Sequence, residues 1–123
     1  MSITVGERRT LVLVEALSRT HLVKYAGASG DFNPLHHDDE LARTAGHAGV
    51  IAHGMLTMGL TGRLLTDWFG VSALRSFSVR FRGPVRPGDT LTAQGEITAI
   101  ADGTATLTVQ TVNQHGEVVL AGS

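Results

Sequence analysis

Residues 53–69 read His53-Gly-Met-Leu-Thr-Met-Gly-Leu-Thr-Gly-Arg-Leu-Leu-Thr-Asp-Trp-Phe69, and their apolar side chains recur with a helical period. One stripe repeats every fourth residue, at Leu56, Leu60, Leu64 and Trp68. Other apolar residues widen it nearly all the way round: Met55, Met58, Leu65 and Phe69. A helix with so much apolar surface is stable in water only when other parts of the chain cover it. We therefore predict a long helix that the rest of the fold wraps.

Three glycines interrupt this helix, at Gly54, Gly59 and Gly62. Each glycine in a helix interior costs about 1 kcal/mol relative to alanine. We expect close packing of neighbouring elements against the bare backbone to offset this cost.

The sequence pattern changes from helical to alternating after Gly70. Phe77, Val79 and Phe81 alternate with polar residues, which is typical of a strand with one buried face. Asp102-Gly103 predicts a type I′ hairpin turn. Further strands are expected around residues 91–97, 107–109 and 117–121, with turns at residues 84–89 and 115–116. The second half of the chain is therefore predicted to be an antiparallel meander.

Before the long helix, the pattern predicts a short strand over residues 11–15 and a helix that Ser18 caps at its N-terminus. This helix should end near residues 27–30, and a short helix should follow around residues 38–45. Strands of about ten residues reach roughly 33 Å, enough to curl around a helix of roughly 25 Å. We predict one α+β domain spanning residues 1–123, with a long central helix wrapped by a curved antiparallel sheet.

The composition excludes several classes of protein. With 123 residues and 42% hydrophobic content, the chain has the size and apolar fraction of an ordinary globular domain. Ten Lys and Arg residues oppose eleven Asp and Glu residues without a basic block, so we expect no nucleic-acid partner. The sequence has no cysteine, which excludes disulfides, thiolate nucleophiles and zinc sites built on cysteine.

The distribution of apolar residues bears on the location of the chain. Residues 1–10 mix charged and small side chains and lack the apolar core of a signal peptide. No apolar run is long enough to cross a bilayer. We therefore expect a cytoplasmic location and no membrane partner.

A constrained loop precedes the long helix and reads Ser29-Gly-Asp-Phe-Asn-Pro-Leu-His36. Pro34 disfavours helical geometry at the residue before it, and Gly30 can adopt a positive φ. Such a loop can turn Asp31 and His36 toward one point, which a regular helix does not do for residues five apart. A carboxylate and an imidazole that bind one water are suited to general acid–base catalysis. Alternatively, Asp31 makes only an Asx turn and His36 is an ordinary surface residue.

The run His36-His-Asp-Asp-Glu40 ends this segment. Its acidic residues suit the first turn of a helix, where the helix dipole favours negative charge. Adjacent histidines followed by aspartates could also suggest a metal site, but consecutive ligands lack the separated spacing that zinc and iron sites show. We therefore expect no metal and no other cofactor.

Two segments resemble the hydratase motif of the MaoC-like, (R)-specific enoyl-CoA hydratases: Tyr25-Ala-Gly-Ala-Ser-Gly-Asp-Phe-Asn-Pro-Leu-His36 and Ile51-Ala-His-Gly-Met-Leu-Thr-Met-Gly59. The chain is similar in particular to the catalytic subunit of the actinobacterial (3R)-hydroxyacyl-ACP dehydratases of mycolic acid synthesis. The resemblance continues through Val79-Arg-Phe81 and Val85-Arg-Pro-Gly-Asp89 and covers most of the chain. It implies a single hot-dog fold.

The resemblance implies reversible addition of water to trans-2-enoyl thioesters, which gives (3R)-hydroxyacyl thioesters. It assigns Asp31 as the base, His36 as the residue that orients the water and shares the proton, and Gly54 as the oxyanion donor through its backbone N–H. The third assignment agrees with general physics, because the first N–H groups of a helix lack acceptors and glycine leaves them open to the thioester. Substrate-binding roles are expected for three neighbouring residues: Asn33, which would also brace the loop, His53 and Met55.

The resemblance also implies partners. The substrate is expected to be an acyl-CoA or acyl-ACP thioester, and exposed edges of a curved sheet favour a homodimer or a heterodimer with another hot-dog subunit. Arg80, Arg82 and Arg86 lie on or beside a predicted strand. They form either a solvated outer face or a cationic rim for the phosphates of the carrier.

Two other functions fit the same fold. In a hot-dog acyl thioesterase, a carboxylate would promote hydrolysis of the thioester instead of addition to the alkene. In a hetero-oligomeric dehydratase, a subunit can bind acyl chains without catalysis, and such a subunit would be free to lose Asp31 or His36. This chain has both residues.

Overall fold

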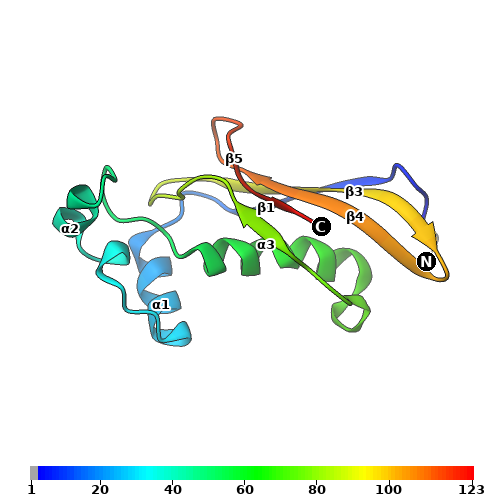
Figure 1. Cartoon of the computed structure of the whole chain (residues 1–123), viewed down its shortest axis with the longest axis horizontal. Helices are drawn as coiled ribbons and strands as arrows, with labels where there is room; N and C mark the ends of the chain where they lie inside the picture. The colour runs from blue at the N-terminus through cyan, green and yellow to red at the C-terminus, as the bar shows by residue number, and fades with distance from the viewer. Residues whose placement is uncertain (1–2) are drawn as a thin grey trace.

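A five-stranded antiparallel sheet lies over one long helix in the computed structural model, which describes residues 3–123 (Figure 1). The sheet order is β1-β3-β4-β5-β2. The strands are β1 (Arg8–Val14), β2 (Val79–Phe81), β3 (Leu91–Ala101), β4 (Thr104–Val112) and β5 (Val118–Gly122). This arrangement confirms the predicted α+β class. Strands β3, β4 and β5 form the predicted antiparallel meander, but β2 pairs with β5 and not with β3, its neighbour along the chain.

The long helix α3 (Gly54–Phe69) begins one residue later than the predicted range and ends where predicted. Leu64 and Trp68 are buried as expected, but Thr57 and Thr61 are buried too. The Thr61 hydroxyl donates to the Thr57 carbonyl, and the Thr111 hydroxyl of β4 lies 2.6 Å from the Thr61 hydroxyl. These hydrogen bonds satisfy polar groups that would otherwise be costly to bury.

The predicted long helix packed against an antiparallel sheet is present, and part of the helix surface stays exposed. Met55 is 58% exposed, and no atom lies within 4 Å of the position that a Cβ of Gly59 would take. The sheet covers one side of the helix only, because a single five-stranded layer cannot enclose it (Figure 1). The expected close packing is found at Gly62, whose Cβ position lies 3.6 Å from the Phe77 ring, and at Gly54.

A glycine on the sheet side controls the distance between helix and sheet. A Cβ on Gly95 of β3 would lie 3.1 Å from the Leu64 side chain and 3.3 Å from the Trp68 ring. Both distances are tighter than ordinary van der Waals contact, so the bare backbone of Gly95 lets α3 lie close to the sheet.

The strand connections follow the predicted turn chemistry. Asp102 and Gly103 have φ angles of 52° and 75°, as a type I′ turn requires, and they join β3 to β4. Strand β2 is shorter than the alternating pattern suggested. Ser78 instead exchanges backbone hydrogen bonds with Ser123, so pairing continues beyond the assigned strand.

The helical segments before α3 confirm their predicted capping. Ser18 caps α1 (Arg19–Ser29) with its side chain, and Gly30 ends this helix with a φ of 76°. The short helix α2 (Asp39–Thr44) begins after Asp38, whose carboxylate accepts from two backbone N–H groups of the first turn. Among residues 3–123, no helix is long and apolar enough to cross a membrane.

The Asp39 carboxylate, at the first residue of α2, also binds two other segments of the chain. Arg19 of α1 donates to both of its carboxylate oxygens, at 2.8 and 3.0 Å, and the Val50 N–H donates to Oδ1 at 3.0 Å. The Arg19 hydrogen bond, reinforced by the Val50 N–H, lowers the pKa of the Asp39 carboxyl. Asp39 thus ties α1 and α2 to the segment that leads into α3.

This coupling predicts an acid-dependent difference in stability between the wild type and Asp39→Asn. A folded-state pKa below the unfolded value means that the stabilisation is fully present above the unfolded pKa and is lost as pH falls through the folded pKa. We expect Asp39→Asn to have the lower urea midpoint at neutral pH and the gap to close in acid. A gap that stays constant from neutral to acidic pH would contradict this role of the carboxylate.

Candidate active site

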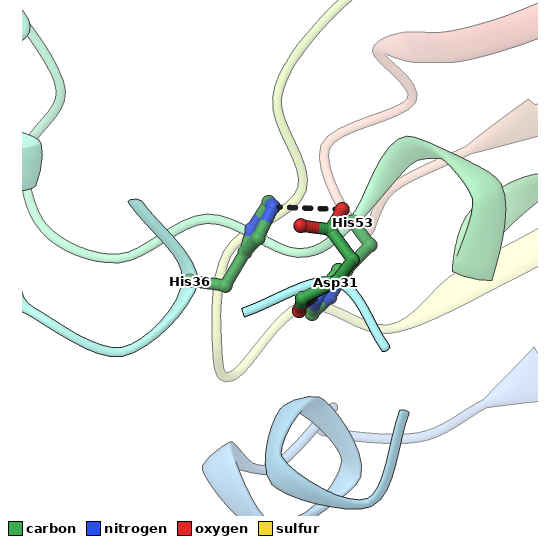
Figure 2. Close-up of side chains that lie close together, drawn as sticks. All are labelled: Asp31, His36 and His53. Atoms are coloured by element: carbon green, nitrogen blue, oxygen red, sulfur yellow. Dashed lines mark hydrogen bonds and ion pairs between the residues drawn. The ribbon is translucent and has the colours of Figure 1, made fainter. Parts of the chain in front are cut away.

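The loop between α1 and α2 is held by short-range hydrogen bonds that its sequence dictates. The Asp31 carboxylate accepts from the Asn33 N–H at 3.2 Å, and the Asn33 side chain accepts from the Leu35 N–H at 3.0 Å. Residues Pro34–His36 form one turn of 3₁₀ helix. Asn33 therefore braces the loop in the way its expected supporting role requires, and the loop turns the His36 side chain back toward Asp31 (Figure 2).

The structure brings Asp31 and His36 together. Nε2 of His36 lies 3.8 Å from Oδ2 of Asp31 (Figure 2). This distance is too long for a direct hydrogen bond, and a single water could bridge the two groups. The Asp31 side chain is 51% exposed and the His36 side chain 11%, so the carboxylate is open to solvent while the imidazole is held by its surroundings.

A backbone carbonyl fixes the tautomer of His36. Nδ1 of His36 lies 2.7 Å from the carbonyl oxygen of Ile51, which can only accept. Nδ1 therefore carries the hydrogen, and Nε2 of the neutral ring presents a lone pair toward Asp31. An imidazole in this state can take a proton from a water that the carboxylate also binds.

His53 lies behind these two residues. Its ring is 2% exposed and stacks on the His36 ring, with 3.7 Å between centroids and 22° between planes. Its Nε2 lies 3.1 Å from the backbone carbonyl oxygen of Asp31, and its ring and the Tyr25 ring pack edge to face, with 4.8 Å between centroids. His53 is therefore buried behind the pair.

Asp31, His36 and His53 also form a group whose ligand atoms lie within 4.8 Å of one another. The ring geometry argues against a metal ion at this point. The lone pair of each ring nitrogen lies in the plane of its ring, and the planes of two stacked rings are nearly parallel, so the lone pairs do not point at one site. Zinc needs nitrogens that point at the same ion from about 2.0–2.1 Å. Nδ1 of His36 and Nε2 of His53 are also each within hydrogen-bond distance of a carbonyl oxygen. The arrangement suits proton transfer better than metal binding.

Gly54 is the first residue of α3, directly after His53. The His53 side chain does not cap the helix, and the backbone N–H groups of Gly54 and Met55 have no intrahelical acceptor, whereas the Leu56 N–H donates to the His53 carbonyl. A Cβ on Gly54 would lie 3.1 Å from the ring of Phe81 in β2. Glycine was expected here because it lets a thioester approach the N–H. The structure adds a second reason, which is that the Phe81 ring occupies the space that a Cβ would need.

A groove of about 400 Å³ runs past Gly54 and Phe81. Its walls also include Ile51, Thr57 and Arg82. Met55, the third expected substrate-binding residue, lies at the start of α3 and is largely exposed.

The sequence analysis missed Phe81 and Tyr25 as parts of this site. Tyr25 could have been found as the first residue of the quoted motif, whereas nothing in the alternation of β2 marks Phe81 as a neighbour of Gly54.

Known proteins share this fold and motif. The MaoC like domain matches residues 3–119. The 3-oxo-4,17-pregnadiene-20-carboxyl-CoA hydratase beta subunit of Mycobacterium tuberculosis is 38% identical over 83% of this chain and 80% of its own length. The (R)-specific enoyl-CoA hydratase of Rhodospirillum rubrum is 33% identical over 96% of this chain and 84% of its own length. An (R)-hydratase of A. caviae involved in PHA biosynthesis has a TM-score of 0.87 at 34% identity, over 98% of this chain and 93% of that chain.

The long helix packed against a five-stranded antiparallel sheet is a hot-dog fold, as the match to the (R)-hydratase structure also shows. The chain belongs to the MaoC-like domain family. This membership confirms the resemblance that the two motif segments predicted.

Proposed function

We propose that this chain catalyses the reversible addition of water to trans-2-enoyl thioesters, which gives (3R)-hydroxyacyl thioesters. The observation that carries the proposal is the 3.8 Å gap between Asp31 Oδ2 and His36 Nε2, with the His36 tautomer set by the Ile51 carbonyl. The relatives from R. rubrum and A. caviae, both named as (R)-hydratases, support the reaction class.

In this mechanism one water lies between the two side chains. Its oxygen bonds to C3 of the alkene while its proton passes to Asp31, and His36 Nε2 orients the water and shares the proton. Electrons move from the C2–C3 double bond toward the thioester carbonyl, and negative charge gathers on its oxygen. Transfer of the proton to C2 completes the addition, so one water is consumed and no other reactant is needed.

The growing charge on the thioester oxygen needs a donor, and we assign the Gly54 N–H to this role. The positive end of the α3 dipole and the uncapped first turn both favour negative charge there. One oxyanion donor contributes about 10²- to 10³-fold to the rate, and general acid–base catalysis about 10²- to 10⁴-fold. Both contributions together are needed for an efficient enzyme.

The carrier and the assembly belong to the same proposal. The groove past Gly54 leads to Arg82, which could meet the phosphates of coenzyme A or of a phosphopantetheine arm. Strand β2 pairs only with β5, so its other edge is free to pair with a second hot-dog subunit, identical or different. The M. tuberculosis relative is named as a beta subunit, which supports assembly with a partner. A cytoplasmic location stays a prediction that cell fractionation would test.

Product analysis with crotonyl-CoA tests the reaction. We expect intact 3-hydroxybutyryl-CoA of the R configuration and no release of free thiol, since Asp31 and His36 are arranged to deliver water to an alkene. Free coenzyme A would indicate a thioesterase, and no turnover of crotonyl-CoA or the matching enoyl-ACP would favour a non-catalytic acyl-binding subunit. Sedimentation of the same sample gives the assembly: a species of 13.0 kDa alone at assay concentration would contradict the dimer.

A further inference from the structure

His53 contacts or adjoins each of the three residues assigned to the reaction, Asp31, His36 and Gly54. Its Nε2 lies 3.1 Å from the backbone carbonyl oxygen of Asp31, its ring stacks on His36 at 3.7 Å, and its backbone caps the helix that begins with Gly54. Each of these contacts reaches one of the three groups assigned to the reaction. His53 thus lies beside Asp31 and His36 (Figure 2) and directly precedes Gly54 in the chain.

The hydrogen-bonding state of His53 follows from its surroundings. The Asp31 carbonyl accepts only, so Nε2 carries a hydrogen and donates it. Nδ1 is buried and has no hydrogen-bond partner among residues 3–123. An unpaired buried polar atom destabilises a fold, and a phenylalanine ring would fill nearly the same space without one. The ring therefore combines one unpaired buried nitrogen with the hydrogen bond that Nε2 makes to the catalytic loop, which makes it a candidate for a role beyond packing.

We propose that His53 is a positioning residue that sets the geometry of the water site without touching the substrate. The hydrogen bond to the Asp31 carbonyl fixes where the catalytic loop crosses the start of α3. The stacked ring fixes the plane of the His36 imidazole, so that Nε2 faces Oδ2 across the gap of 3.8 Å. This inference rests on the proposed function and replaces the substrate-binding role that the sequence suggested for His53.

Two substitutions separate the contacts. His53→Phe keeps a ring to stack on His36 but loses the donor to Asp31, and His53→Gln keeps an N–H donor but loses the ring. We expect both to lower kcat for crotonyl-CoA hydration by about 10- to 100-fold, because small misplacements of reacting groups cost this much. KM should stay near the wild-type value. The thermal midpoint of His53→Phe should stay near that of the wild type, since removal of the unpaired Nδ1 opposes the loss of the hydrogen bond to the Asp31 carbonyl.

His37 offers a matched control. It also places Nε2 within hydrogen-bond distance of a carbonyl of the same loop, that of Phe32 at 3.2 Å, but it is exposed and stacks on no catalytic ring. We expect His37→Phe to keep wild-type kcat. An equal loss in His37→Phe would show that any loosening of the loop accounts for the effect, and it would overturn the inference.

Other results are equally decisive. The inference fails if both His53 variants keep kcat near wild type, if their loss is confined to KM, or if kcat falls only as the thermal midpoint falls. His53→Gln decides the matter if His53→Phe does not fold. If the wild type shows no hydratase activity, the proposed function fails, and the inference is judged by ¹⁵N spectra of the histidine rings. We expect these spectra to show one His36 tautomer in the wild type and a mixture in the His53 variants; an unchanged single tautomer would refute it.

Discussion

We expect Asp31→Asn to lower the rate of crotonyl-CoA hydration by about 10²- to 10⁴-fold, the range that general acid–base catalysis contributes. The asparagine amide cannot take a proton from water, so the base is lost while the size of the side chain is kept. The fold should not change. The Asp31 oxygen that accepts from the Asn33 N–H has a counterpart in the asparagine carbonyl, so the turn that shapes the loop is preserved.

Asp38→Asn is the control for this change. Asp38 lies on the same segment and also accepts backbone N–H groups with its carboxylate, as the cap of α2. Asparagine caps helices about as well as aspartate, so we expect neither stability nor turnover to change beyond experimental error. Steady-state rates and thermal midpoints of the two variants, measured side by side, are the comparison. Near wild-type turnover in Asp31→Asn would refute the assignment of the base.

The loop that holds Asp31 and His36 could be predicted because local chemistry determines it. Gly30 ends α1 with a positive φ, and Pro34 begins the 3₁₀ turn that the Asn33 side chain caps, so the shape of the loop depends on residues next to one another. The role of His53 could not be predicted in this way. Its hydrogen bond to Asp31 joins residues 22 positions apart, and only the packing of α3 under the loop brings them together.

The fold shows the same division between local and distant causes. The Asp102-Gly103 turn and the Ser18 cap follow from short motifs, and both were predicted correctly. The apolar pattern correctly predicted that a sheet would cover α3, but it did not show which part of the helix surface the sheet would leave exposed. Met55 is exposed and the space beside Gly59 is open. The apolar residues of a sequence indicate which surfaces favour burial, but they do not show whether the same chain or a partner buries them.

His36 should be nearly as sensitive as Asp31, and two variants test its two expected actions separately. The amide of His36→Asn can reach the Ile51 carbonyl as Nδ1 does, at 2.7 Å in the wild type, but nothing then replaces Nε2. The longer His36→Gln side chain can place an amide oxygen near the position of Nε2. That oxygen can accept a hydrogen bond from the water but cannot take its proton.

We expect His36→Asn to lower kcat by about 10²-fold or more, and His36→Gln to recover part of this loss, because orientation of the water is kept and only proton sharing is lost. Both variants should bind crotonyl-CoA with near wild-type KM, since neither change alters the groove past Gly54. Wild-type kcat in His36→Gln would mean that the ring only orients the water, leaving Asp31 as the sole proton acceptor. Wild-type kcat in His36→Asn would show that the lone pair facing Asp31 takes no part in the reaction, and the water would have to be placed elsewhere.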